Sequence, residues 1–325
     1  MMPKPSVTCI GELIADFISL KPGTTISNTP AFSKRAGGAA ANVAVGLAKL
    51  GVASSFVGKV GSDSIGIFLR DELRSHGVDV SGLRFDRSHK TRLAFVSLTS
   101  MGERDFEFWE QHPADEQLRP PDLNLNRISE SAIIHLSSFL LLGEPSRSTA
   151  MVIVNELRKR GCEISFDPNL RLSLWDSKSE ARRMLLRMAA NATILRLNEE
   201  EATLLTGMRN TRDATKRLIS IGPSVVVVTS GSRGCAVRTA GRYAVVKGFR
   251  VKTVDTTGCG DAFLAGLLSG IVKARKPAHE LSLEELRPMC RYANAVGALT
   301  STRYGGIASL PHAAQARKFL SKMNK

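Results

Sequence analysis

The sequence predicts an α/β fold, in which a mostly parallel β-sheet has helices on both of its faces. Beyond residue 130, short apolar runs alternate with segments in which apolar residues recur at helical spacing. Such alternation is typical of β-α units, which build parallel sheets covered by helices. The chain has 325 residues, of which 43% are hydrophobic, so it can bury a large core as one large domain or as two smaller ones.

The N-terminal part of the chain is expected to begin with a buried strand and an exposed ribbon. Residues 7–10 form a short apolar run that ends at Gly11, which indicates a strand followed by a turn. Residues 13–20 and 31–35 are more polar and are separated by prolines, which favours an exposed β-ribbon. Further expected elements are a helix between Gly38 and Gly51, a strand at 54–57 and a helix at 64–75.

A second ribbon is expected near residue 100. Residues 92–99 and 105–109 alternate between apolar and polar side chains, and they flank Ser100-Met101-Gly102-Glu103, which is typical of a hairpin turn. We expect this hairpin and the first ribbon to form a small sheet that projects from the main body.

The rest of the chain supplies the β-α alternation. Strands are expected at residues 132–136, 163–166, 193–197 and 225–229, with a hairpin at 235–239 and 242–246. Helices are expected at residues 146–160, 179–190, 199–206, 260–273, 283–299 and 313–323.

Composition argues against several classes of protein. No apolar run reaches about 18 residues, the length that a membrane-spanning helix needs, and the N-terminus lacks the hydrophobic stretch of a signal peptide. The five cysteines are far apart in the sequence. This spacing favours free thiols and a cytoplasmic location over disulfides or a zinc site.

The formal net charge of +15 raises the question of an anionic partner. The basic residues are dispersed along the chain, and aromatic residues make up only 6% of it, so platforms for base stacking are scarce. We therefore do not expect nucleic acid to be the main partner. An anionic substrate explains part of the charge, and a nucleic-acid binder remains an alternative that steeply salt-dependent binding would favour.

The run from Asp255 to Phe263 carries the strongest chemical signal. Its glycines permit a tight turn and leave the amides of Gly258, Cys259 and Gly260 uncovered at the start of a helix. These amides and the helix dipole favour an anion such as phosphate. Asp261, in the first turn, is suited to accept a hydroxyl proton, although an acid there can also simply stabilise the helix start.

A second group of candidate site residues lies in the N-terminal part. Gly37 and Gly38 permit the close approach of a ligand, and Asn42 projects from the first turn of the helix that follows. Asp16 adds a carboxylate on the ribbon, and short amide and carboxylate groups suit a hydroxyl-rich ligand. The alternatives are a plain strand-to-helix turn and a solvated ribbon residue.

Other polar positions follow or lie within predicted strands. Asn198 and Glu201 have the spacing of a capping box, and they could instead organise Mg²⁺ and a phosphate-bound water. Residues 229–234 follow a β-branched strand, where open sheets place ligands, so they form either a phosphate-binding loop or a hairpin loop. His135 lies in an apolar strand and is expected to be a core residue.

Together these segments resemble the ribokinase-like (PfkB) family of carbohydrate kinases, and within it the fructokinases. The family signatures are similar to residues 36–44 with 58–63 and to residues 255–263, and the fructokinase-like segments are 91–96, 166–175 and 302–307. The resemblance implies one doubly wound α/β domain over residues 1–325. It also implies a small β-sheet lid, formed by about residues 13–36 and 91–110.

The resemblance implies a role for each matching residue. Asp261 would be the catalytic base, with the amides of Gly258, Cys259 and Gly260 as the anion hole. Sugar binding is implied for Asp16, Gly37, Gly38, Asn42 and Arg171, and ATP binding for Asn198, Glu201, Thr229, Gly231, Gly234 and Asn294. Glu201 would act on Mg²⁺ indirectly, and a site for the monovalent cation K⁺ is implied at Asp255, Thr257, Ser301, Tyr304 and Gly306.

The implied enzyme is an ATP-dependent sugar kinase that acts on a primary hydroxyl, converting fructose to fructose 6-phosphate. The alternatives are a kinase for ribose, 2-keto-3-deoxygluconate or an aminoimidazole riboside, and a non-catalytic member of the family. An exposed lid is also a plausible surface for a homodimer. Two positions depart from the family pattern: Ala40 stands where fructokinases usually have proline, and Cys259 replaces a usual alanine. The thiol of Cys259 would add sensitivity to oxidation or alkylation.

Overall fold

The computed structural model describes residues 6–21, 23–98, 104–109 and 111–323. Within these ranges the strands form two separate sheets, one of nine strands and one of four. The strands are β1 (Val7–Ile10), β2 (Ile14–Ser19), β3 (Phe32–Gly37), β4 (Ser54–Gly61), β5 (Asp79–Asp86), β6 (Leu93–Leu98), β7 (Arg104–Trp109), β8 (Ile133–Ser137), β9 (Glu163–Asp167), β10 (Ile194–Asn198), β11 (Val225–Thr229), β12 (Gly234–Thr239) and β13 (Arg242–Lys247).

The large sheet confirms the predicted doubly wound arrangement. Its strand order is β13-β12-β11-β10-β9-β8-β1-β4-β5, and the strands from β11 to β5 pair in parallel, whereas β12 and β13 are antiparallel. From β1 the chain proceeds to β4 and β5 in one direction, and from β8 it proceeds to β13 in the other. The order of the strands therefore reverses between β1 and β8, where open α/β sheets bind their ligands at the carboxyl ends of the strands.

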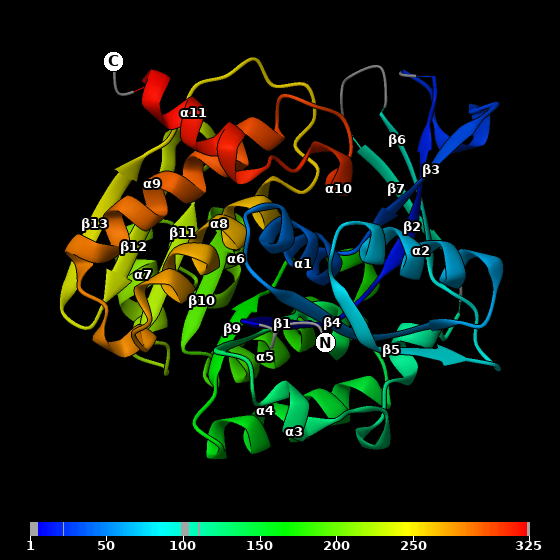
Figure 1. Ribbon diagram of the computed structural model, residues 1–325, viewed down its shortest axis with the longest axis horizontal. Coiled ribbons are helices and arrows are strands. Elements are labelled where there is room, and N and C mark those ends of the chain that lie inside the picture. The colour runs from blue at the N-terminus through cyan, green and yellow to red at the C-terminus, as the bar shows by residue number, and fades with distance from the viewer. Residues whose placement is uncertain (1–5, 22, 99–103, 110, 324–325) are drawn as a thin grey trace.

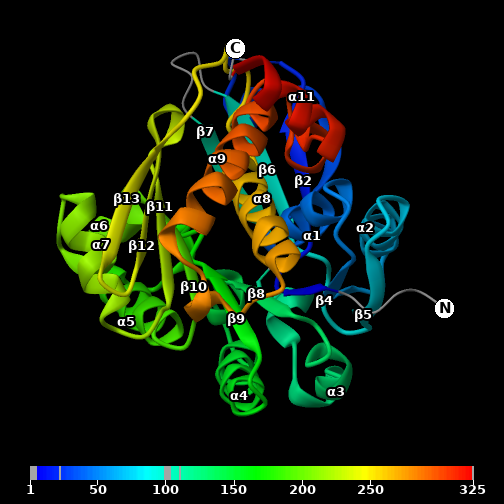
Figure 2. The same cartoon turned by 60° about the vertical axis from the view of Figure 1, so that its left-hand side comes forward.

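Helices cover both faces of this sheet (Figures 1 and 2). One face packs on side chains of α1, α2, α8, α9 and α11, and the other on side chains of α4, α5, α6 and α7. The helices are α1 (Ala39–Lys49), α2 (Ser64–Ser75), α3 (Leu125–Ile128), α4 (Ser146–Lys159), α5 (Lys178–Ala189), α6 (Glu199–Thr206), α7 (Thr211–Ile219), α8 (Cys259–Ala274), α9 (Leu283–Thr300), α10 (Gly306–Ser309) and α11 (Ala313–Met323). No helix in the described part of the chain is both long and apolar enough to cross a bilayer.

Apolar sequence explains why α8 is the central helix. Residues 261–269 of α8 are all buried, and the helix lies between α1 and α9 (Figure 2). A helix that is apolar on all sides is stable in water only when other elements surround it. This burial fixes the N-terminus of α8 inside the molecule.

The predicted small sheet is present. β2 pairs with β3 and β6, and β6 pairs with β7, so its strand order is β3-β2-β6-β7. The hairpin turn predicted at Ser100-Met101-Gly102-Glu103 lies outside the described residues, but the antiparallel pairing of β6 with β7 confirms the hairpin. Figure 1 shows this sheet to one side of the main body, next to α1 and α2.

Sequence reasoning missed β5 and α7, and also the two one-turn helices α3 and α10. β5 is an edge strand of the large sheet with alternating burial, and its sequence mixes charged and apolar residues. α7 is a short helix with three buried residues, Ala214, Thr215 and Leu218. Both elements carry few apolar residues, because each buries only one side. A search for apolar runs therefore passes over them.

A buried ion pair joins the small sheet to the main body. Arg92 immediately precedes β6 and is only 4% exposed. Its Nε lies 3.0 Å from the carboxylate of Asp115, and its Nη2 lies 2.6 Å from that of Glu116. Burial raises the pKa of Asp115, and the positive charge of Arg92 counteracts that rise. The contact is thus both a link between two parts of the fold and a compensation of buried charge.

We predict that Arg92→Met destabilises the protein, because it leaves the buried Asp115 and the partly buried Glu116 without their cation. The free energy of unfolding should fall by about 3 kcal/mol, since removing one partner of a buried pair leaves an uncompensated charge. Urea unfolding followed by circular dichroism measures this change. Arg160→Met is the control, because its exposed partner is Glu156, and it should cost less than about 0.5 kcal/mol. Equal effects of the two variants would contradict the prediction.

Candidate active site

The N-terminus of α8 is the centre of the candidate site. Gly258 precedes the helix in a left-handed conformation, with φ of 75°, which glycine adopts without strain. The first residues of a helix have no acceptor for their amides within the helix, so they can bind an anion. Of the three predicted amides, that of Cys259 donates to the carbonyl of Thr256 at 3.3 Å. The amides of Gly258 and Gly260 are therefore the better candidates for the anion hole.

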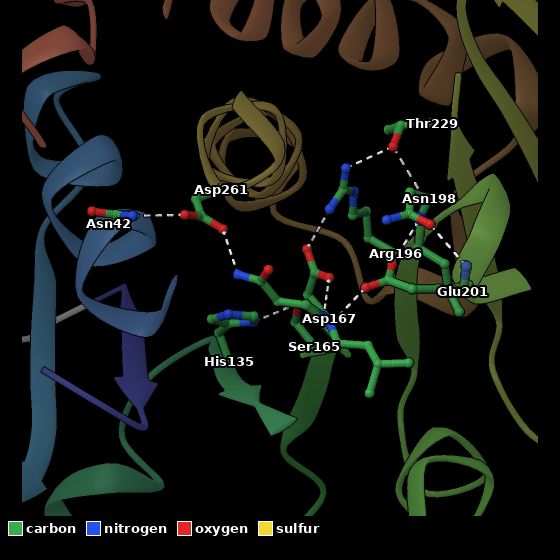
Figure 3. A network of polar contacts seen from close by, with 12 residues as sticks. Asn42, His135, Ser165, Asp167, Arg196, Asn198, Glu201, Thr229 and Asp261 are labelled. Carbon is green, nitrogen blue, oxygen red and sulfur yellow. Dashed lines mark hydrogen bonds and ion pairs between the residues drawn. The ribbon is translucent and has the colours of Figure 1, made fainter. Parts of the chain in front are cut away.

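Asp261 lies in the first turn of α8 and is only 6% exposed. Its carboxylate accepts hydrogen bonds from Nδ2 of Asn42 at 2.7 Å and from Nδ2 of Asn169 at 3.3 Å (Figure 3). The helix has no side-chain N-cap bond. Asp261 is thus directed at two other elements, and the alternative in which it merely stabilises the helix start does not account for its contacts.

The environment of Asp261 raises its pKa to about 7. Burial is the largest cause, and the nearby Asp167 adds to it, whereas the hydrogen bond from Asn42 and the charges of Arg196 and Arg171 act in the opposite direction. A general base is most effective when its pKa lies near the working pH. Asp261 therefore has the geometry and the pKa of a group that accepts a proton near neutrality.

One cavity of about 220 Å³ opens beside Asp261. Four of the predicted sugar-binding residues line it, and Gly37 does not. A Cβ on Gly37 would clash with the carboxylate of Asp16, so Gly37 makes room for that side chain. The residues that line the cavity with polar groups include Glu12, Asp16, Gly38, Asn42, Asn169, Arg171, Thr257 and Asp261.

Asn42 offers this cavity an additional acceptor. Its side chain is only 6% exposed, and its Oδ1 has no hydrogen-bond partner among the residues that the structure describes. A buried amide oxygen without a partner is costly, and a ligand hydroxyl would satisfy it. Because carboxylate and amide groups of this kind line the cavity, it suits a small ligand with several hydroxyl groups.

A second cavity, of about 290 Å³, lies on the other side of the N-terminus of α8. It contains the predicted nucleotide-binding residues except Glu201, and it also contains the aromatic ring of Phe249. Its predicted lining residues are Asn198, Thr229, Gly231, Gly234, Cys259, Gly260, Asn294 and Ser301. The two cavities share Arg196, Asn198 and Gly260. Ligands in the two cavities would therefore meet at the start of α8.

Arg196 is the main site residue that sequence reasoning missed. It is 8% exposed, and its guanidinium donates to Asp167 at 2.9 Å and to Thr229 at 2.6 Å (Figure 3). These partners are the last residues of β9 and β11, the strands on either side of β10. A charged residue within the apolar run of β10 was the available signal. Asn169 and Asp167 belong to the segment that carries Arg171, and the contacts between these groups arise only in the folded chain.

Asn198 and Glu201 form the capping box that their spacing predicts. The amide of Glu201 donates to Oδ1 of Asn198, and the amide of Asn198 donates to Glu201, both at 2.8 Å. The other carboxylate oxygen of Glu201 accepts the amide of Leu170 at 2.8 Å, and burial raises the pKa of this group. Both oxygens of Glu201 thus hold backbone amides. This arrangement fits an indirect role toward a metal ion rather than direct ligation.

In the described residues, no group of three or more His, Cys, Asp or Glu side chains is arranged to hold a metal ion. A divalent cation in this site would therefore depend on the phosphates of a ligand and on water for most of its coordination. Such coordination is usual for Mg²⁺, which keeps several waters and binds substrate phosphates.

Asp255 joins the two loops in which a monovalent cation is expected. One oxygen accepts the amide and hydroxyl of Thr257 at 2.9 and 2.8 Å, and the other accepts the amide of Gly305 at 2.9 Å. The carbonyl of Ser301 accepts the amide of Val254 at 2.7 Å. These bonds bring the loop around Asp255 next to the loop that begins at Ser301. A cation site made of backbone oxygens from both loops would require this proximity. The side chain of Tyr304 is 69% exposed.

His135 is a core residue, as its apolar surroundings predict. It is fully buried, and its Nδ1 lies 3.2 Å from the hydroxyl of Ser165 (Figure 3). Burial lowers its pKa to about 4, so the ring is neutral near pH 7. It lines neither cavity.

Comparisons with known proteins identify several similar chains. The chain is 40% identical over 322 residues to probable fructokinase-7 of Arabidopsis thaliana. The matched segment covers 97% of this chain and 92% of that protein. The fructokinase of Vibrio cholerae O395, solved as a double mutant with fructose, ADP and potassium ion, has a TM-score of 0.87 and 32% identity over 98% of both chains.

Two further solved structures are similar. The fructokinase of Xylella fastidiosa with bound ATP has a TM-score of 0.91 and 29% identity, over 99% of this chain and 100% of that one. The aminoimidazole riboside kinase of Salmonella enterica, complexed with its riboside and an ATP analogue, has a TM-score of 0.83 and 30% identity, over 97% and 99%. A model of the pfkB family carbohydrate kinases matches residues 4–313, and the chain belongs to this family.

Proposed function

We propose that this protein is a fructokinase, which transfers the γ-phosphoryl group of ATP to the primary hydroxyl of fructose and forms fructose 6-phosphate. The observation that carries this proposal is the position of Asp261. Its carboxylate, with a pKa of about 7, borders the polar cavity close to the point where the two cavities join. The similar proteins include several fructokinases, and one solved fructokinase holds both fructose and ADP.

In the proposed reaction the sugar occupies the cavity lined by Asp16, Asn42 and Arg171, and ATP occupies the other. Asp261 accepts the proton of the sugar hydroxyl while the oxygen of that hydroxyl forms a bond to the γ-phosphorus of ATP. The bond between that phosphorus and the bridging oxygen of ADP breaks. The amides of Gly258 and Gly260 donate to the charge that develops on the phosphoryl oxygens.

Mg²⁺ and K⁺ are the proposed metal ions. Asn198 and Glu201 would hold Mg²⁺ through water, and the loops around Asp255 and Ser301 would hold K⁺ through backbone oxygens, with contributions from Thr257, Tyr304 and Gly306. Bound Mg²⁺ would neutralise charge on the ATP phosphates, and bound K⁺ would hold the two loops in register. The potassium ion in the similar fructokinase structure supports the second assignment.

The small sheet is the proposed lid of a single kinase domain. Asp16 and Phe108 on one of its faces line the sugar cavity, so closure of the sheet would exclude water from the reaction. We place the enzyme in the cytoplasm. The five cysteines, all within the described residues, form no disulfides with one another, and we propose a reducing compartment on the grounds of their spacing in the sequence.

The sugar itself is the part of the proposal with a specific competitor. The similarity to aminoimidazole riboside kinase over 97% of the chain favours a riboside as the second candidate substrate. A non-catalytic role accounts less well for a base whose pKa is tuned to about 7 at the junction of two cavities.

We predict that Asp261→Asn reduces turnover at least about 100-fold, because general-base catalysis contributes that much or more. ATP binding, measured by calorimetry, should persist, because Asp261 does not line the second cavity. In the parent enzyme the ionised carboxylate is the active form. The kcat/KM value should therefore fall as the pH drops below about 7, through the raised pKa of Asp261. Near-normal turnover by the variant would refute the role of Asp261.

The substrate is tested by ADP release in a coupled assay across fructose, ribose, 2-keto-3-deoxygluconate and aminoimidazole riboside. Fructose should give the highest kcat/KM, and omission of K⁺ should lower it. If the enzyme prefers a riboside to fructose, the proposed substrate is wrong, but the assignment as a kinase stands. No sugar-stimulated ADP release with any of the four would contradict the proposed function.

We also propose that the outer face of the lid joins two copies of this chain. Phe17 and Phe95 stack at 5.1 Å, and Phe95 lies 4.8 Å from Trp109, whose side chain is 53% exposed. Because side chains alternate along a strand, these rings lie on the face opposite to Asp16 and Phe108. An exposed aromatic cluster of this kind suits a protein interface.

Trp109→Lys should shift the protein from dimer to monomer in sedimentation experiments, since it places a charge in the apolar contact. Val152→Lys on α4 is the matched control, because Val152 is 54% exposed on a different part of the molecule. It should leave the dimer unchanged. A parent protein that sediments as a monomer would exclude this interface.

A further inference from the structure

Glu12 is a buried acidic residue to which the reaction above assigns no role. It follows β1 by two residues and is only 1% exposed, at the floor of the sugar cavity. It therefore lies where the strand order reverses between β1 and β8. Burial raises the pKa of this carboxyl. A group that is costly to bury needs a compensating set of contacts.

The contacts of Glu12 connect a strand end to a helix start. One carboxylate oxygen accepts the amide of Ala39, the first residue of α1. The other accepts the hydroxyl of Ser137, the last residue of β8. The backbone of Glu12 takes part as well, since a Cβ on Gly38 would come within 2.5 Å of the Glu12 carbonyl oxygen. The turn at Gly38, where φ is 104°, is thus packed directly on Glu12.

The position of α1 determines the position of Asn42. Asn42 lies one turn after Ala39, and its amide makes the first bond of the helix to the carbonyl of Gly38 at 2.8 Å. Its side chain donates to Asp261 at 2.7 Å, and its buried Oδ1 has no partner within the described part of the chain. A displaced helix start would therefore move the group that contacts both the base and the sugar.

We propose that Glu12 is a positioning residue, which anchors the start of α1 to the ends of β1 and β8 and thereby places Asn42 for Asp261 and for the sugar. The inference rests on the kinase function proposed above. Glu12 itself contacts neither the phosphoryl group nor the reacting hydroxyl in this scheme. Its effect reaches the chemistry through Ala39 and Asn42.

Charge and geometry make different demands at this position. A carboxylate at a helix N-terminus is favoured by the helix dipole, yet Asp115 on the neighbouring segment opposes a negative charge here. The bond from the amide of Ala39 requires an acceptor oxygen at the length of a glutamate side chain, whereas the hydroxyl of Ser137 can donate to an oxygen or accept from an NH2 group. Gln keeps that length and can accept from Ala39, whereas Asp keeps the charge and shortens the reach by one methylene.

The test compares Glu12→Gln, Glu12→Asp and Glu12→Ala in the full-length enzyme, after sugar-dependent turnover of the parent has been established. Glu12→Gln should retain kcat/KM for fructose within about threefold of the parent, whereas Glu12→Asp and Glu12→Ala should lose about 10- to 100-fold, because small misplacements of reacting groups have effects of this size. The KM for ATP should stay within about twofold, since Glu12 does not line the second cavity.

The pH profile separates positioning from simple stability. The hydrogen bond from Asn42 lowers the pKa of Asp261, alongside Arg196 and Arg171, whereas burial and Asp167 raise it. If Asn42 moves away, that pKa rises further, so the acidic limb of kcat/KM in Glu12→Asp should shift to higher pH. A role confined to folding would change only the melting temperature.

Two controls complete the design. Ser137→Ala removes one bond of Glu12 but leaves the anchor to Ala39, so it should have a smaller effect than Glu12→Asp. Asp79→Asn removes the charge of a buried carboxylate that binds Arg127, and neither residue lines the two site cavities. This variant should lower stability without changing the pH profile.

Two outcomes overturn the proposal. The first is a folded Glu12→Asp enzyme with unchanged kcat/KM and acidic limb. The second is a Gln variant that is less active than the Asp variant, which would assign the effect to charge. Should Glu12→Ala fail to fold, the comparison of Gln with Asp still decides between these results. A parent without sugar-dependent turnover would instead contradict the function proposed above.

Discussion

The site depends on the hydrogen bond between Asn42 and Asp261, two residues that are 219 positions apart in the chain. This bond joins α1, which follows the small sheet, to α8, which is the central helix of the core. α1 and α8 also pack against each other over their length. The contact between the two helices brings the two side chains to 2.7 Å, and both of them line the polar cavity.

Burial at this contact gives the carboxylate its chemistry. In water an aspartate would be fully ionised at neutral pH and a weak base. Removal from water raises the pKa of Asp261 to about 7, while Asn42, Arg196 and Arg171 prevent a larger rise. Arg196 lies among Asp167, Glu201 and Asp261 and compensates part of their charge. The cost of burying several carboxylates together is therefore reduced by one arginine that three adjacent strands position.

The two faces of the small sheet carry different side chains, because side chains alternate along its strands. Asp16 and Phe108 face the sugar cavity, whereas Phe17, Phe95 and Trp109 form an aromatic cluster on the other side. The ion pairs of Arg92 with Asp115 and Glu116 tie the sheet to the main body beside the cavity. The proposed lid movement would thus pivot near a buried charged contact, and the proposed dimer would use the face opposite to the cavity.

The sequence by itself determined the β-α alternation, the small sheet, and about half of the residues that line the two cavities. These features depend on local patterns: apolar runs mark strands, helical spacing marks helices, and glycines mark the turns at Gly38 and Gly258. The capping box of Asn198 and Glu201 was also readable, because its two partners are three residues apart. β5 and α7 escaped notice because each buries too few apolar side chains to stand out.

Only the tertiary structure decided how these residues act together. Arg196 looks like an isolated charge in a strand until β9 and β11 bring Asp167 and Thr229 beside it. Glu12 acquires a role only because β8 and the start of α1 meet at the end of β1. The pKa of Asp261 likewise depends on burial and on neighbours from distant segments. Long-range contacts and the exclusion of water are properties of the packed chain, and no local pattern in the sequence encodes them.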